Sequence, residues 1–206
     1  MEKDGIEAAN EKGLEAFMEE YLPPREQWGS WTHPKTGDQY EVALSAASGL
    51  SDADFEACFQ LIELTSAEDY KQSKAGWKPS AKRREMKLLD LKYFLVKRGS
   101  QTEGFVSFMP THEDGYPVIY CYEIHLATTL RGTGLAGALM RLLESVGRRI
   151  PETTKMMLTC FTGNQRAAQF YAKLGYSEDE FSPKPRVLRN GTRVESEYVI
   201  LSKSLS

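Results

Sequence analysis

The chain has 206 residues, of which 41% are hydrophobic and 27% are charged, and its formal net charge is −3. A length near 200 suits one domain with a substantial core, and the composition excludes a disordered tail protein and a collagen-like protein. The slightly acidic balance argues against binding nucleic acid through overall charge, and no apolar stretch is long enough to cross a membrane.

The first 22 residues are acidic and predict one amphipathic helix. They carry seven Asp or Glu residues against two lysines. Apolar side chains recur at helical spacing on one face of residues 5–22, and two prolines then end the pattern. These apolar residues are Leu14, Phe17, Met18 and Tyr21. Residues 25–38 predict a loop. We therefore expect residues 1–37 to form a helix and a loop packed on the outside of a main domain, residues 38–206.

From residue 38 on, segments with a two-residue period alternate with segments of helical period. The predicted strands are residues 40–44, 91–97, 103–108, 118–126 and 156–161. The predicted helices are residues 51–62, 66–74, 80–89, 133–149 and 164–174. Asn190-Gly191 predicts a hairpin turn in the tail. This order is typical of one mixed α/β domain, in which the basic run Lys82-Arg83-Arg84 is expected on a solvated helix face.

The three cysteines give no sign of a disulfide framework or a zinc site. Cys58, Cys121 and Cys160 are odd in number, and their spacing fits neither. The N-terminus also lacks the basic-then-apolar order of a secretion signal. We expect an intracellular protein with reduced thiols and no bound metal.

The most specific motif lies between the predicted strand that ends at Leu126 and the helix that follows. Residues 130–137 read Leu-Arg-Gly-Thr-Gly-Leu-Ala-Gly and contain the pattern Arg-x-x-Gly-x-Ala. Small residues at a helix start let a ligand approach the backbone, where the first N–H groups have no partner and the helix dipole is positive. This arrangement suits a pyrophosphate. The alternative is a tight turn whose glycines serve geometry alone.

A second motif, residues 164–176, has the form Asn-x-x-Ala-x-x-Phe-Tyr-x-x-x-Gly-Tyr. Together the two motifs resemble the GCN5-related N-acetyltransferase (GNAT) superfamily. The resemblance implies acetyl-CoA as the acetyl donor. It also implies a GNAT fold, in which a mixed central β-sheet is splayed at the acetyl-CoA site and flanked by helices, here with an N-terminal helical extension.

The same resemblance implies a set of cofactor-binding residues. In the superfamily the small-residue loop holds the pyrophosphate, and the backbone of the strand before it holds the pantetheine arm. The corresponding residues here are Ile124, His125, Leu126, Arg131, Gly132, Thr133, Gly134, Leu135, Ala136, Gly137, Asn164 and Tyr171. Tyr171 is either the acid that protonates the leaving thiolate or a residue of the helix core.

Further blocks resemble the NatD type of N-terminal acetyltransferase within that superfamily. They are Ala8-Ala9-Asn10, Leu14-Glu15-Ala16-Phe17, Gly76-Trp77-Lys78, Lys82-Arg83-Arg84-Glu85-Met86, Tyr120-Cys121-Tyr122-Glu123, Met157-Leu158-Thr159-Cys160-Phe161 and Tyr198-Val199-Ile200-Leu201-Ser202. This resemblance implies a monomeric enzyme of the nucleus and cytoplasm. Its partners would be the tails of histones four and two-A, whose N-terminal serine, in Ser-Gly-Arg-Gly-Lys, it would acetylate.

Two rival functions remain open. One is an acetyltransferase of the same superfamily that acts on a lysine or a small amine. The other is a domain that only binds acetyl-CoA or histone tails.

Glu123 is the candidate general base. Strand alternation places it on one face with Ile119, Cys121 and His125. A carboxylate in so apolar a strand is costly unless it is paired or functional, and burial would raise its pKa toward a value useful for a base. An α-amine has a pKa of about 7.7–8.0, so a weak base is sufficient, directly or through one water. The alternative is a structural Glu123 tied to an Arg or Lys.

Several side chains match positions that line the peptide in the NatD type. They are Tyr70, Trp77, Thr111, Glu113, Tyr120, Tyr122, Thr159 and Tyr198. Tyr122 is also assigned to catalysis, since backbone N–H groups near it could polarise the reacting carbonyl. Glu113 and Asp114 are candidates to bind the substrate arginine, with a solvated turn as the alternative. The sequence departs from the family at Thr111, where an Asp is expected, and at Ala75, where an aromatic residue is expected.

Overall fold

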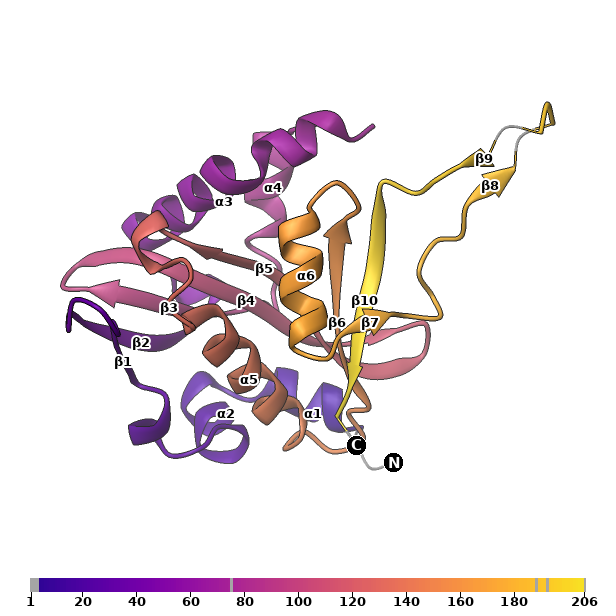
Figure 1. The fold of residues 1–206 in the computed structure, drawn as a ribbon. Helices are drawn as coiled ribbons and strands as arrows, with labels where there is room; N and C mark the ends of the chain where they lie inside the picture. Colours follow the sequence, from indigo (N-terminus) through magenta and orange to yellow (C-terminus); the bar gives the residue numbers. More distant parts are fainter. Residues whose placement is uncertain (1–3, 75, 188, 192, 206) are drawn as a thin grey trace.

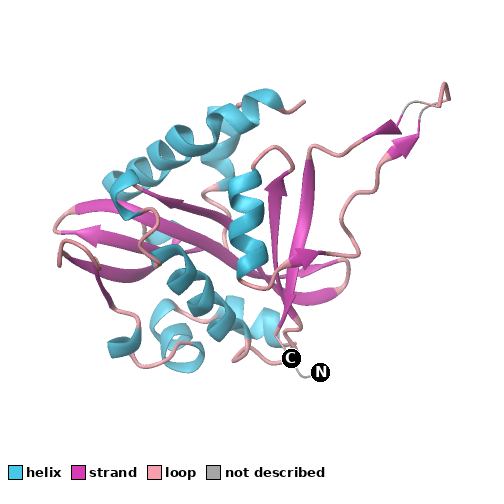
Figure 2. Cartoon of the chain, viewed as in Figure 1, coloured by secondary structure: helices cyan, strands magenta, loops and turns pink. Residues whose placement is uncertain are grey.

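The computed structural model describes residues 4–205 apart from residues 75, 188 and 192, so Ala75 lies outside it. An eight-stranded mixed sheet has the order β1-β2-β3-β4-β5-β6-β10-β7 (Figures 1 and 2). Its strands are β1 Ser30–Thr32, β2 Gln39–Ala46, β3 Lys92–Arg98, β4 Gln101–Glu113, β5 Tyr116–Leu126, β6 Lys155–Phe161, β7 Ser177–Glu178 and β10 Tyr198–Ser204. All neighbours pair antiparallel except β5 and β6, which are parallel. The predicted α/β class and mixed sheet are confirmed.

Helices cover both faces of this sheet (Figure 1). They are α1 Gly5–Glu11, α2 Leu14–Tyr21, α3 Asp52–Gln72, α4 Pro79–Glu85, α5 Leu135–Gly147 and α6 Gln165–Lys173. Side chains of α1, α2, α5 and α6 pack on one face in what we call the first core, which contains Phe17, Leu139 and Tyr171. Side chains of α3 and the segment after α4 pack on the other face in the second core, which contains Phe59 and Met86.

The predicted strands are all present, and β4 is longer than predicted. The predicted strand ended at Phe108, whereas β4 continues through Pro110, which cannot donate to a strand ladder. In the structure β3 pairs with β4 only as far as Phe108, so Pro110 lies where β4 has β5 alone as a neighbour. Its carbonyl on the open side accepts a hydrogen bond from Asn10 Nδ2 at 2.8 Å, which ties α1 to this edge.

The helices differ from prediction at two places. One helix was expected over residues 5–22, but Lys12 and Gly13 are extended and separate α1 from α2, with Gly13 as the N-cap of α2. Glycine is costly inside a helix, which favours the break. Conversely, the two helices expected in residues 51–74 form the single helix α3, capped by the Ser51 side chain.

The remaining elements are short. β1 is a three-residue edge strand in the segment predicted as a loop. β8 Arg186–Val187 and β9 Arg193–Val194 flank Asn190-Gly191 as a hairpin that projects away from the sheet (Figure 1). Cys58, Cys121 and Cys160 are free and buried. Within the described residues no helix combines the length and apolar character needed to span a bilayer.

Candidate active site

A β-bulge at Tyr122 sets the direction of the side chains in the second half of β5. Ser107 of β4 is paired with Glu123 and Phe108 with Cys121, so Tyr122 is an extra residue on β5. Such a bulge re-aims the side chains that follow it. Cys121 packs in the first core, whereas Tyr122 packs against the second. The predicted shared face of Cys121, Glu123 and His125 is therefore wrong, because strict alternation ends at the bulge.

The sheet opens at the same point. β5 and β6 pair from Val118 with Lys155 to Cys121 with Leu158, and no further. Beyond Cys121, no strand in the described part of the chain pairs with this edge of β5. The predicted splay between the two strands is thus confirmed. It leaves backbone N–H and C=O groups of residues 122–126 facing the opening.

Glu123 is buried among polar side chains from α3, α4 and β5. Its Oε1 accepts a hydrogen bond from Lys82 Nζ at 2.8 Å and lies 3.4 Å from the Tyr70 hydroxyl. Its Oε2 lies 2.6 Å from His125 Nε2. Only 11% of the Glu123 side chain is exposed, and pairing with a lysine is the contact that the structural alternative foresaw.

The pKa of Glu123 moves in the direction opposite to the prediction. Burial by itself would raise it, but the neighbouring His125 and Lys82 outweigh burial and lower the pKa of Glu123 to about 2. The expected rise is wrong because it considered desolvation without the donors that α4 and β5 bring to the carboxylate. Glu123 is consequently an ionised, weakly basic carboxylate.

The basic run predicted Lys82 on a solvated helix face, and this prediction is wrong. Its side chain is 7% exposed, and its ammonium group bridges Glu123 and Glu85 Oε1, the latter at 2.6 Å. The Tyr70 ring lies 4.8 Å below the same ammonium group. The next residues do match the prediction in part, since Arg84 is exposed and Arg83 half-buried. A run of three basic residues does not show which of them the helix directs inward, and here it is Lys82.

Sequence reasoning assigned His125 through its backbone and missed its side chain. The imidazole is buried, with Nε2 on Glu123 and Nδ1 at 2.5 Å from Thr65 Oγ1 of α3. Thr65 in turn donates to the Leu61 carbonyl at 2.8 Å. The bulge is responsible, since it turns His125 toward α3. No periodic signal in the sequence marks it.

The small-residue loop has the backbone that a helix-start anion site requires. Gly132 and Gly134 have φ of 73° and 91°, a left-handed conformation that favours glycine. Gly134 is the N-cap of α5 and has no side chain to satisfy the first N–H groups of this 13-residue helix. Arg131 Nε donates to the Leu126 carbonyl at 3.1 Å and fastens the loop to β5. Thr133 Oγ1 donates to the Leu130 carbonyl at 2.7 Å.

Asn164 and Tyr171 both belong to α6. The Asn164 side chain accepts from the Ala167 N–H as the N-cap of α6 and donates to Asp69 of α3 at 3.1 Å. Tyr171 is buried in the first core, and burial raises its pKa well above the ordinary value, with the charges of Cys121, Cys160 and Glu123 adding to the effect. Burial alone thus keeps its phenol protonated at neutral pH, where the thiols of Cys121 and Cys160 are themselves uncharged.

The aromatic residues predicted to line a peptide form two groups. In the first, the Tyr120 hydroxyl lies 2.6 Å from Thr159 Oγ1, and the rings of Tyr120 and Tyr122 are 5.4 Å apart. In the second, the Tyr70 ring contacts Trp77 at 5.4 Å and Phe161 at 5.0 Å. Phe161 is paired in register with Tyr198, which is 41% exposed. Tyr70 of the second group contacts Glu123 through its hydroxyl, and Tyr122 of the first group directly precedes Glu123 on β5.

Thr111 and Glu113 lie further along β4, toward its turn with β5. They lie two and four residues after Met109, so all three side chains share one face of β4. Met109 packs against the second core and is paired with Tyr120. Thr111 and Glu113 therefore share the face of the tyrosines. Burial, and then the charge of Asp114, raises the pKa of Glu113. Asp114 itself has a positive φ of 48° at the tip of the turn.

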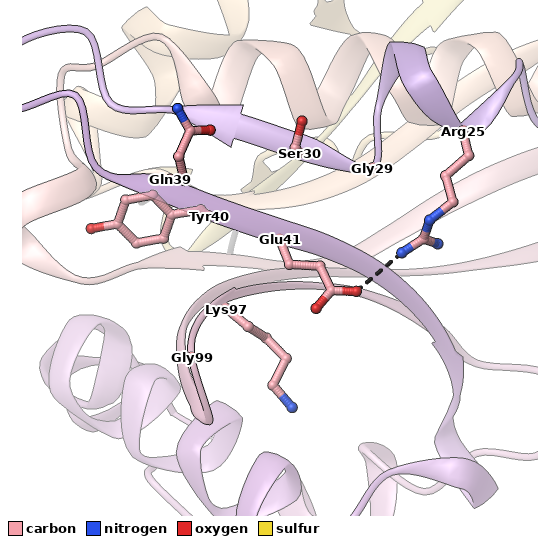
Figure 3. A pocket seen from close by; sticks show the side chains of 8 residues that line it. All are labelled: Arg25, Gly29, Ser30, Gln39, Tyr40, Glu41, Lys97 and Gly99. Atoms are coloured by element: carbon pink, nitrogen blue, oxygen red, sulfur yellow. Dashed lines mark hydrogen bonds and ion pairs between the residues drawn. The ribbon is translucent and has the colours of Figure 1, made fainter.

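An open hollow of about 440 Å³ lies elsewhere, beside β1 and β2 (Figure 3). An ion pair between Arg25 and Glu41, 3.0 Å long, crosses it. Its other lining residues are Gly29, Ser30, Gln39, Tyr40, Lys97 and Gly99. No residue predicted for the site lines this hollow. Among the described residues, no group of three or more His, Cys, Asp or Glu side chains is arranged to hold a metal ion.

The chain is similar to known acetyltransferases. Residues 56–176 match the acetyltransferase (GNAT) family. N-alpha-acetyltransferase 40 of Saccharomyces cerevisiae is 31% identical over 158 residues, which are 65% of this chain and 55% of that protein. The chain thus spans about half the length of this curated relative.

Solved structures share the fold at low sequence identity. The GNAT domain of PAT from S. lividans is 14% identical with a TM-score of 0.60, covering 88% of this chain and 99% of that one. A GNAT family acetyltransferase from Elizabethkingia anophelis, solved with acetyl-CoA bound, is 14% identical with a TM-score of 0.52, covering 80% of this chain and 97% of that one.

Proposed function

This chain belongs to the acetyltransferase (GNAT) family, and we propose that it transfers acetyl from acetyl-CoA to the N-terminal α-amine of proteins. The observation that carries the proposal is the carboxylate of Glu123, held by Lys82, Tyr70 and His125 just beyond the point where β5 and β6 separate. The similarity to a relative named N-alpha-acetyltransferase 40 supports the same choice of amine.

The finer proposal is that the substrates are histones four and two-A, through the N-terminal serine of Ser-Gly-Arg-Gly-Lys. Glu113, on the face of the tyrosines, and Asp114, next to it in the turn, would bind the substrate arginine. Tyr70, Trp77, Thr111, Tyr120, Tyr122, Thr159 and Tyr198 would line the peptide. We further propose a monomer that works in nucleus and cytoplasm, without direct contacts to nucleic acid.

The residues present suit acetyl-CoA, which supplies the acetyl group as a thioester. The start of α5, where Gly134 provides no side-chain cap, and the two left-handed glycines would receive the pyrophosphate, and the edge of Ile124, His125 and Leu126 that no described strand pairs with would receive the pantetheine arm. Asn164 sits beside this opening as the cap of α6. Among these contacts, those of the α5 start are the most specific to an anion.

The side chains around Glu123 divide the proton transfers. Glu123 would accept the proton that the amine nitrogen loses as it bonds to the acetyl carbon. Backbone N–H groups near Tyr122 would polarise the acetyl carbonyl. The C–S bond then breaks, and the Tyr171 phenol, which is protonated at neutral pH, would give its proton to the leaving thiolate.

An acetylation assay on peptides tests this proposal. We expect Ser-Gly-Arg-Gly-Lys to be acetylated on its α-amine, and Ser-Ala-Ala-Gly-Lys to react about 10- to 100-fold more slowly, since charge-assisted hydrogen bonds contribute about 1.5–3 kcal/mol. Mass spectrometry of the peptide with a blocked α-amine separates the rivals. Acetyl on its lysine at undiminished rate would favour a lysine acetyltransferase. Binding of acetyl-CoA without CoA release in any assay would favour a binding module.

Gly134→Val is expected to weaken acetyl-CoA binding about 10- to 100-fold, measured by calorimetry. A β-branched residue at a φ of 91° costs about 1–3 kcal/mol, so the loop moves and its N–H groups with it. Gly99→Val is the matched control, because Gly99 also has a positive φ, 60°, but lies in the β3–β4 turn. Equal losses of affinity in the two variants would contradict the role of the loop.

A further inference from the structure

The two oxygens of the Glu123 carboxylate are occupied by donors from three elements of the fold. Lys82 of α4 and Tyr70 of α3 are on Oε1, and His125 of β5 is on Oε2. The Lys82 and His125 side chains are each 7% exposed, so solvent does not replace these donors. An ionised carboxylate accepts about four hydrogen bonds in all. Most of its accepting capacity is used before any substrate amine arrives.

The hydrogen-bond partners of His125 place a proton between His125 and Glu123. Thr65 Oγ1 donates to the Leu61 carbonyl and lies 2.5 Å from His125 Nδ1, which fixes the imidazole from the side of α3. His125 Nε2 lies 2.6 Å from Glu123 Oε2, and two bare acceptors would repel each other at that distance. This assignment follows from the partners of each atom. The Glu123 Oε2 atom is therefore occupied by His125 before a substrate amine arrives.

Lys82 occupies the other carboxylate oxygen, Oε1, as a hydrogen-bond donor. Burial would lower the pKa of Lys82, but the charges of Glu123, Tyr70 and Glu85 outweigh burial and raise that pKa well above its ordinary value. The Lys82 ammonium is thus a permanent cation beside Glu123. It is also no competing nucleophile, since it never becomes a neutral amine at physiological pH.

The remaining titratable groups near Glu123 do not offset these two donors. They are Cys121 of β5, Glu85 of α4, Tyr93 of β3, Tyr70 of α3 and Tyr171 of α6. Burial raises the pKa of both Cys121 and Tyr171, so they are neutral at pH 7. Glu85 forms an ion pair with Lys82, and the Glu85 side chain is 39% exposed. Lys82 and His125 therefore dominate the environment of the carboxylate.

We infer that the Lys82–Glu123–His125 cluster limits this site to amines that arrive neutral, and thereby selects N-terminal α-amines over lysine side chains. The inference rests on the proposed function, in which Glu123 faces the substrate amine. Lys82 and His125 are positioning residues that act through Glu123. Glu123 takes a proton only while the new C–N bond forms, when the nitrogen becomes more acidic, and does not strip an incoming ammonium group.

The magnitudes make this a strong selection. With ordinary pKa values of about 7.7–8.0 and 10.4, about one α-amine in ten is neutral at pH 7, against a few lysine amines in ten thousand. This difference alone favours the α-amine about 300-fold. Transfer from an α-ammonium group to a carboxylate whose pKa is lowered by His125 and Lys82 is strongly unfavourable, so it does not bypass the selection.

The pH dependence of kcat/KM for two peptides tests the inference. One is Ser-Gly-Arg-Gly-Lys, and in the other β-alanine replaces the serine, which makes the terminal amine more basic. The pKa of each amine is measured separately by NMR. We expect log kcat/KM to rise with a slope near one from pH 5.5, and to level off at the pKa of each peptide's own amine. The test compares the pH at which each profile levels off. Weaker binding of the β-alanine peptide lowers its kcat/KM but does not shift that pH.

Variants of α4 provide the matched comparison. Lys82→Met removes the cation, which should raise the pKa of Glu123, reduce the slope below one and lower the preference for α-amines over lysines. Lys82→Arg keeps the charge and should retain the slope. Arg84→Met is the control on an exposed position of the same helix and should leave the profile unchanged.

The outcomes separate this inference from the function on which it rests. A flat profile between pH 5.5 and 7, or a break at one pH for both peptides, overturns the inference alone, since α-amine acetylation still occurs. A Lys82→Met enzyme that folds and keeps the wild-type slope also overturns the role of Lys82. Absence of acetylation on both peptides at every pH overturns the proposed function and the inference with it.

Discussion

Glu123→Gln is expected to lower kcat/KM for a Ser-Gly-Arg-Gly-Lys peptide about 10²- to 10⁴-fold, the usual contribution of a general base. The amide keeps the shape of the side chain but cannot accept the amine proton. Acetyl-CoA contacts would come from the α5 start and the β5 edge, so the affinity for acetyl-CoA should change little. Steady-state kinetics and calorimetry with acetyl-CoA measure the two quantities on the same preparation.

Glu85→Gln is the control for this substitution. Glu85 is the other carboxylate on Lys82, at 2.6 Å, but it belongs to α4 and its side chain is 39% exposed, against 11% for Glu123. We expect its effect on kcat/KM to stay within a few-fold. Because Glu123→Gln also leaves the buried Lys82 without its main partner, circular dichroism should accompany the kinetics. A folded Glu123→Gln enzyme with wild-type turnover would remove Glu123 from the mechanism.

The sequence predicted most strands of the sheet well because each has a local apolar pattern, either alternating or continuous. The strands around Val42, Phe94, Val106 and Leu158 all carry alternating or continuous apolar side chains that must be buried. The glycine loop before α5 was equally clear, since its residue types have a direct backbone meaning. Such local signals do not depend on which segments meet in space.

The environment of Glu123 could not be predicted in this way. It depends on one extra residue, Tyr122, whose presence as a bulge follows from the pairing of β4 with β5 and not from either strand alone. It also depends on α3 and α4, which bring Tyr70, Thr65 and Lys82 to the carboxylate. Strict alternation gave the wrong face, and burial considered alone gave the wrong direction of the pKa shift.

Phe17→Ala is expected to lower the free energy of unfolding by about 3–5 kcal/mol, as for other fully buried phenylalanines. Phe17 of α2 is 0% exposed, and its ring lies 5.1 Å from Tyr21 and 6.4 Å from Phe108 of β4. We propose that residues 1–37 pack on the domain of residues 38–206 and unfold with it. Urea denaturation followed by circular dichroism and by tryptophan fluorescence should then give one coincident transition.

The same substitution links the N-terminal helices to the active site, because Phe108 is the residue of β4 at which the bulge begins. Phe108 stacks on Phe94 at 5.5 Å and is held on its other side by Phe17. A cavity there loosens the strand that fixes the register of Tyr122 and Glu123, so kcat should fall even below the melting temperature. Glu19→Ala, on the exposed face of α2, should change stability by less than about 0.5 kcal/mol. Two separate transitions, or a Phe17→Ala enzyme with unchanged stability, would show that residues 1–37 are a dispensable extension instead.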